Sequence, residues 1–202
     1  MRFVGIVLLL ILAAGAAFAE YDKVDDCPVF NGNCVAEPNT DEPGLGTWRY
    51  EMTINWDTGR NGVSHIDLIV DNGENCSEAD LEAGLDFATV AGQAAGEPSC
   101  TVDFWADIEP NGDPSIPGVI EPIIKYEYAD GGCELGSNGT AVLVFYSDYT
   151  PYPIQEDNLF LVEKHANRNC RGELTGEFPG LPCAPVTNES ETFSGLKARY
   201  GN

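Results

Sequence analysis

Basic side chains are scarce in this chain. Its 202 residues include 10 Lys and Arg against 33 Asp and Glu, which gives a formal net charge of −23. Surfaces that bind nucleic acids or anionic lipids need clustered Lys and Arg, so we expect neither partner. Hydrophobic residues make up 43% of the chain, too many for a disordered acidic segment. The composition therefore predicts a folded globular domain.

Sequence signatures of catalysis and of structural zinc sites are also missing. The chain has no Gly-x-Ser-x-Gly, His-Glu-x-x-His or Cys-x-x-Cys motif, and its two histidines, His65 and His165, lie far apart. Ser64, His65 and Asp67 have the residue types of a catalytic triad. On a strand, however, His65 and Asp67 share one face while Ser64 points away, so we expect no local triad and interpret His65 as a half-buried structural residue.

Long apolar runs are confined to the N-terminus. Met1 and Arg2 precede an apolar run over residues 3–18, which ends at Ala17-Phe18-Ala19. This pattern predicts a signal peptide over residues 1–19, with cleavage before Glu20. The run is shorter than the ~20 residues that a membrane-spanning helix needs. We expect a secreted protein, extracellular or periplasmic, with no membrane span after cleavage.

Cysteine is present in an odd number, which leaves at least one thiol outside intramolecular pairs. The seven cysteines are Cys27, Cys34, Cys76, Cys100, Cys133, Cys170 and Cys183. An exported protein favours disulfides. Short loops favour the pairs Cys27–Cys34 and Cys170–Cys183, and Cys76–Cys100 would close a longer surface loop. Cys133 would then form an intermolecular bridge or a reactive thiol; the alternatives are a different pairing or a buried thiol.

Apolar residues alternate with polar ones in several short segments separated by Gly, Pro and Asn. The predicted strands cover residues 50–56, 66–70, 101–108, 119–128, 140–146, 158–164 and 172–178. The first two should form a hairpin across residues 57–62, and a short helix over 77–83 should begin at the cap Ser77. Residues 20–46 are interpreted as a disulfide-looped segment, 47–183 as the folded domain, and 184–202 as a polar C-terminal tail.

Many short strands without a long 3.6-residue period are typical of an all-β fold. We predict an antiparallel β-sandwich of the Ig-like or jelly-roll type, rich in loops and stapled by disulfides. A closed barrel is the alternative.

Four features carry a resemblance to a group of uncharacterised secreted bacterial proteins. They are the strand with Tyr50, Met52, Ile54 and Trp56; Ser64 to Leu68 with Cys76; Asn111 to Gly118; and the tail with Phe193, Leu196, Lys197 and Tyr200. The group resembles this chain over residues 47–147 and the tail, through a Ser-His-[Ile/Phe]-x-Leu strand and a Lys-x-x-Tyr ending. The resemblance implies an exported β-sandwich domain and no particular reaction. Phe193 stands where the group usually has Trp.

Alternation places Asp103, Trp105 and Asp107 on one face of a predicted strand. A tryptophan between carboxylates is typical of a sugar-binding face, because the ring stacks on sugar C–H groups while the acids accept hydrogen bonds from hydroxyls. The alternative is that Trp105 packs under a loop and the acids only face solvent.

The acidic excess also suggests calcium as a cofactor, since Ca²⁺ takes six to eight oxygen ligands. Candidate ligands are Asp71, Asn72 and Glu74 in one turn, and Glu109 with Asp113 in another. Such clusters are equally typical of turns, and the acidity is also explained by adaptation to salt.

We expect an extracellular binding or surface-structural protein with a polysaccharide or another surface protein as partner. One alternative is a secreted hydrolase that uses a carboxylate pair, which 33 acids leave open. The other is a subunit of an extracellular assembly, with Cys133 or the C-terminal tail as the contact.

Overall fold

The computed structural model describes residues 27–69, 77–116, 119, 122–129, 131–153, 159–163 and 169–181. The predicted signal peptide and C-terminal tail, as well as Cys76, His165 and Cys183, lie outside these residues. Within the described part, no helix has the length and apolar character needed to cross a membrane.

The described chain is built almost entirely of strands. They are β1 (Val29–Pro38), β2 (Trp48–Asp57), β3 (Val63–Ile69), β4 (Gly92–Gly96), β5 (Cys100–Glu109), β6 (Ile123–Tyr128), β7 (Asn138–Ser147), β8 (Pro151–Pro153), β9 (Leu159–Glu163) and β10 (Asn169–Pro179). A single short helix, α1 (Glu78–Gly84), follows β3 in the described part. Ser77 caps it and forms the predicted capping box with Asp80. The all-β prediction is confirmed.

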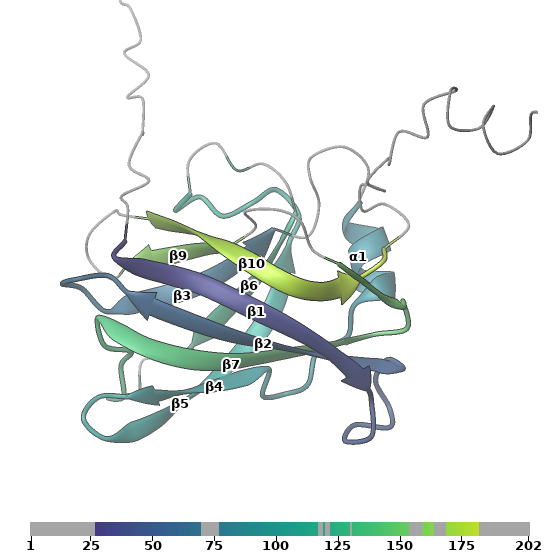
Figure 1. Ribbon diagram of the computed structural model, residues 1–202, viewed down its shortest axis with the longest axis horizontal. Coiled ribbons are helices and arrows are strands. Elements are labelled where there is room, and N and C mark those ends of the chain that lie inside the picture. The colour runs from purple at the N-terminus through teal and green to yellow at the C-terminus, as the bar shows by residue number, and fades with distance from the viewer. Residues whose placement is uncertain are drawn as a thin grey trace, which may run out of the picture.

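The strands form one curled sheet that closes on itself, rather than two facing sheets (Figure 1). The order is β1-β2-β7-β4-β5-β6-β3-β9-β10, and β10 returns to pair with β1. The β1–β10 pairing is parallel, whereas each other neighbouring pair in the ring is antiparallel. β8 adds to β10 alone. The predicted sandwich is thus not confirmed, and the arrangement matches the closed-barrel alternative.

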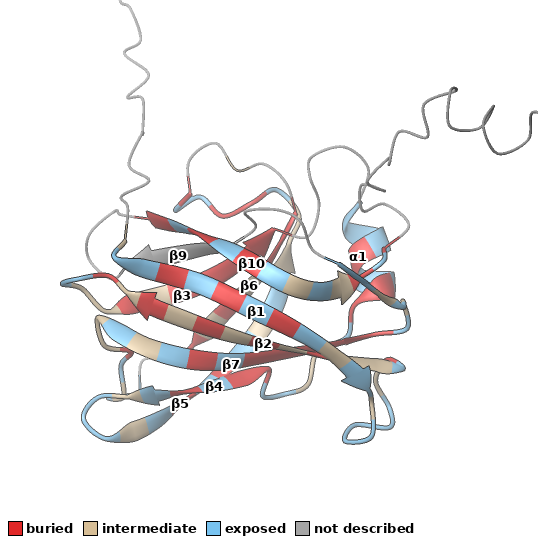
Figure 2. Ribbon diagram, in the orientation of Figure 1, coloured by how far each residue is buried: buried red, intermediate tan, exposed pale blue. Residues whose placement is uncertain are grey.

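The interior of the ring is filled by one apolar core. Strand residues alternate between buried and exposed, as the banding of β1 and β10 shows (Figure 2). Tyr50 and Phe145 are opposite each other on β2 and β7, and their rings stack with centroids 5.0 Å apart. Leu81 and Leu85, at α1, join the same core. Because side chains fill the interior, a ligand would have to bind on the outer surface or at the loops.

Several features of the sequence prediction differ from the structure. Residues 29–38, predicted as part of a loop, form β1, whose inward positions are Phe30, Gly32 and Cys34. The glycine has no side chain, so the apolar alternation of this strand was not visible in the sequence. β4 was missed since its sequence is Gly-Gln-Ala-Ala-Gly. The predicted hairpin of β2 with β3 is wrong: β2 pairs with β1 and β7, and β3 pairs with β6 and β9.

The cysteine pairing also differs from the prediction. The described disulfides are Cys27–Cys170 and Cys100–Cys133. Cys27 and Cys34 cannot pair because an extended strand separates their positions by about 3.3 Å per residue, well beyond disulfide reach. Instead, the parallel β1–β10 contact brings Cys27 to Cys170, 143 residues away. Cys100 and Cys170 have other partners, so the predicted pairs Cys76–Cys100 and Cys170–Cys183 are also wrong. Cys34 rather than Cys133 is the free thiol of the described chain.

Cys34 should be inert in the native protein. Its side chain is buried in the core, and burial raises the pKa of the thiol. We expect Ellman's reagent to label the native wild-type protein and a Cys34→Ala variant equally. After denaturation without reductant, the wild type should show one additional thiol. A difference between the two native proteins would contradict the buried position of Cys34.

Candidate functional site

The outer face of β3, β6 and β5 carries a continuous set of polar side chains. On β3, Ile66 and Leu68 enter the core, so His65 and Asp67 lie on the opposite face. The pairing register aligns Asp67 with Lys125 and then with Asp107 on β5. We call this surface the outer polar face. Its covered half, at β3, contains His65, Asp67 and Lys125 with Asp113 above them, and its open half, at β5, contains Asp103, Trp105 and Asp107 with Glu127 beside them.

The covered half lies beneath the loop that follows β5. Ile116 of this loop packs against Ile69 and Ile123 in a small second core outside the sheet. Asn169, at the start of β10, donates from Nδ2 to the carbonyl oxygen of Ser115 at 2.7 Å. These contacts hold Asp113 of the same loop over β3, and Asp113 is only 3% exposed.

Four side chains meet in the covered half, and the fourth, Lys125, also reaches Glu127 of the open half. His65 Nε2 lies 3.6 Å from Asp67 Oδ2 and 3.5 Å from Asp113 Oδ2. Lys125 Nζ lies 2.6 Å from Asp113 Oδ2 and 2.9 Å from Glu127 Oε1. Within the described chain, His65 Nε2 and both carboxylate oxygens of Asp67 have no hydrogen-bond partner. Buried polar atoms are normally paired, so this arrangement needs an explanation.

Burial sets the protonation of this cluster. Burial lowers the pKa of His65 to about 4, against the opposing charge of Asp113. Burial, together with the charge of Asp113, raises the pKa of Asp67 to about 8. Burial alone would raise the pKa of Asp113, but hydrogen bonds from Lys125 and Ser115 outweigh it and lower that pKa. At neutral pH the metal-free cluster therefore contains a neutral imidazole, a protonated Asp67 and an Asp113–Lys125 ion pair.

The same residues have the composition of a metal site. His65, Asp67 and Asp113 each offer one ligand atom, and the three atoms lie within 4.8 Å of one another. All three residues are buried. An imidazole nitrogen and two carboxylate oxygens are donors that suit zinc and related divalent ions.

The open half contains the residues predicted to bind sugar. Trp105 is 40% exposed, and Asp103 and Asp107 beside it on β5 are also exposed. Glu127 of β6 lies directly opposite Trp105 in the register. On the other side, Gln93 of β4 donates from Nε2 to Asp103 Oδ1 at 2.7 Å. Trp105 does not pack under a loop, so the sequence prediction that it lies on an exposed strand face is confirmed.

The predicted calcium ligands have different outcomes in the structure. Asp71, Asn72 and Glu74 lie outside the described residues. Asp113 is buried beside His65 and Asp67, which the sequence did not nominate as ligands. Glu109 ends β5, half-buried. The shared face of His65 and Asp67 was readable from strand alternation, whereas the approach of Asp113 depends on the loop that covers β3.

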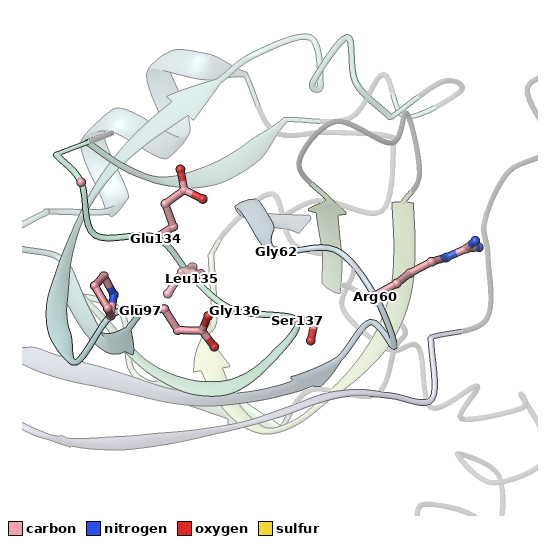
Figure 3. A pocket seen from close by; sticks show the side chains of 9 residues that line it. Arg60, Gly62, Glu97, Glu134, Leu135, Gly136 and Ser137 are labelled. Atoms are coloured by element: carbon pink, nitrogen blue, oxygen red, sulfur yellow. The ribbon is translucent and has the colours of Figure 1, made fainter.

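A second surface feature is an open hollow at another part of the ring. It is lined by loop residues, among them Arg60, Glu97, Glu134 and Gly136 (Figure 3). Glu97 and Glu134 exchange two backbone hydrogen bonds. Their carboxylates point in different directions in Figure 3, and Arg60 points out of the hollow. The hollow therefore does not present the facing pair of carboxylates that the hydrolase alternative requires.

Comparisons with known proteins leave the function to be argued from the structure. No family model, curated protein or solved structure matches the chain.

The protonated Asp67 makes stability depend on pH. The unfolded carboxyl ionises near 3.8 and the folded one near 8, so this contribution is fully present below 3.8 and is lost as pH rises through 8. The pKa of His65 falls from its ordinary value of 6.5 to about 4 on folding, so the opposing contribution of His65 changes mainly between pH 4 and 6.5. In chelator, we expect the free energy of unfolding to fall by about 2 kcal/mol between pH 6.5 and 8, at roughly 1.4 kcal/mol per pH unit for one proton.

Urea unfolding across this range, with wild type and Asp67→Asn compared, measures the effect. The variant should lose the slope because its amide does not titrate. An equal slope in both proteins would show that another group causes it.

Proposed function

We propose that this protein is an exported, non-catalytic binding protein that recognises carbohydrate through the open half of its outer polar face. The observation that carries the proposal is the exposure of Trp105 between two exposed carboxylates on a paired strand. Trp56, by contrast, is buried, and its Nε1 donates to the carbonyl oxygen of Gly136 at 3.1 Å.

The surroundings of Trp105 suit a neutral, hydroxyl-rich ligand. An indole face can stack on the apolar C–H face of a pyranose ring. Asp103, Asp107 and Glu127 offer carboxylate oxygens that accept hydrogen bonds from hydroxyl groups. A hydrogen bond from Gln93 orients Asp103, and an ion pair with Lys125 orients Glu127. Two of these acceptors are therefore preorganised for a ligand.

Charge supports the same ligand class. The chain carries a formal charge of −23, which disfavours polyanions as partners. Val142 of β7 is exposed and aligns with Gln93, so an apolar surface continues the row beyond Asp103. The surface beside Trp105 therefore extends from β5 across β4 to β7, which suits an extended saccharide chain.

Export rests on the predicted leader and on the disulfides. The two described disulfides are consistent with a protein outside the cytoplasm, where thiols are oxidised. Cys133 pairs with Cys100, so the assembly alternative loses its disulfide contact. The tail that the same alternative invoked lies outside the described residues.

Substitution of Trp105 tests the proposal. On an array of neutral polysaccharides, the wild type should bind at least one glycan saturably. Trp105→Ala should weaken that binding about 30-fold or more, because truncation of a central aromatic contact costs about 2 kcal/mol or more. Trp105→Phe should retain part of the affinity. Titrations followed by tryptophan fluorescence give the dissociation constants.

Tyr152→Ala is the matched control, since Tyr152 is an exposed aromatic (42%) on β8, away from this face. It should bind glycan like the wild type, and Trp105→Ala should keep the wild-type unfolding midpoint. Full binding by Trp105→Ala, or no bound glycan for the wild type, would refute the proposed function.

A further inference from the structure

The covered half of the outer polar face contains a different kind of site. We propose that His65, Asp67 and Asp113 bind one divalent transition-metal ion of the zinc type. This inference goes beyond carbohydrate recognition, which uses the open half and requires no metal.

The distances from the imidazole nitrogen to the two carboxylates fit tetrahedral coordination, and all three donor atoms lie within 4.8 Å of one another. Zinc bonds to histidine nitrogen and carboxylate oxygen are about 2.0–2.2 Å long, so neighbouring ligands around the ion lie about 3.4 Å apart. His65 Nε2 is 3.6 Å from Asp67 Oδ2 and 3.5 Å from Asp113 Oδ2. Small side-chain adjustments would therefore bring all three atoms into the coordination sphere.

Two of the three ligand residues, His65 and Asp67, offer donor atoms that have no hydrogen-bond partner in the described part of the chain. The Asp67 side chain is fully buried, and neither of its oxygens accepts a hydrogen bond within the described chain. His65 Nε2 is likewise without a hydrogen bond there. Leaving such groups buried and unpaired is costly. A metal ion would compensate this cost at both residues.

The donor set selects the class of metal. Calcium prefers six to eight oxygen ligands, and magnesium retains several waters in an octahedron of oxygens. A buried imidazole with two carboxylates instead suits zinc and its first-row neighbours. Once metal binding has displaced the proton of Asp67 to solvent, two carboxylates would neutralise the 2+ charge. Three protein ligands leave one position for a further donor.

Lys125 can remain in place when Asp113 binds a metal. Its ammonium group lies between Asp113 and Glu127, at 2.6 and 2.9 Å. Glu127 therefore continues to neutralise Lys125 if Asp113 turns toward the ion. Asp113 Oδ1 accepts from the backbone N–H of Ser115 at 2.5 Å, which orients the carboxylate from its other side.

Direct metal titration of the oxidised, mature protein tests the inference. After treatment with chelator and its removal, we expect one Zn²⁺ to bind per chain and the unfolding midpoint to rise, while Ca²⁺ causes no rise. Asp67→Asn and His65→Gln should each weaken zinc binding about 100-fold or more, since even changes beyond the direct ligands cost 10–100-fold. Asp41→Asn is the matched control, because Asp41 is exposed and contacts Arg49 instead, and it should bind zinc like the wild type.

A readout on the wild type keeps the test decisive if a variant fails to fold. Co²⁺ in a four-coordinate site gives strong visible d–d absorption, whereas six-coordinate Co²⁺ absorbs weakly. A strong spectrum that Zn²⁺ abolishes would support the site. Failure of the wild type to bind zinc, a weak Co²⁺ spectrum, or undiminished zinc binding by Asp67→Asn would overturn it. None of these measurements includes a glycan, so failure here is separate from failure of the proposed function.

Discussion

The parallel pairing of β1 with β10 determines the inside and the outside of the molecule. Without it, the other strands would form an open sheet with two unpaired edges. The close approach of these strands requires a glycine. Gly176 has a φ of +106°, and a Cβ at this position would overlap the carbonyl oxygen of Cys34. Cys27–Cys170 secures the same junction covalently.

Closure explains why both proposed binding sites lie on the outer surface. The inward positions are filled by aromatic and aliphatic side chains, so the interior is a core. Polar residues on β3, β5 and β6 must then face outward. The loop after β5 covers part of this face, which divides it into an open half around Trp105 and a buried half around Asp67. One polar face thus offers two environments, one exposed and one buried, and these suit the two different ligands that we propose.

Local patterns in the sequence predicted the elements better than their arrangement. Alternation located β2 and β5, a continuous apolar run located β7, and the Ser77 cap located α1, because each signal lies within a few residues. The same alternation placed Trp105 on an exposed face. β1 was missed since Gly32 occupies an inward position where an apolar side chain would have shown the alternation, and Asn and Gly together are typical of turns.

Contacts between residues far apart in the chain could not be predicted from the sequence. The Cys27–Cys170 bridge depends on the closure of the ring, and spacing alone favoured shorter loops. The meeting of Asp113 with His65 depends on how Ile116 anchors the covering loop. Residues so far apart in the chain carry no shared local signal, so the buried cluster could be recognised only in the folded chain.

An NMR titration tests most directly whether the outer polar face is the binding surface. Backbone amide shifts would be followed on addition of a bound oligosaccharide and, separately, of Zn²⁺. The largest changes should lie on β5 and β6 around Trp105 for the sugar, and on β3 and residues 110–116 for the metal. Changes concentrated instead around Glu97 and Glu134 would place binding in the hollow of Figure 3 and contradict this assignment.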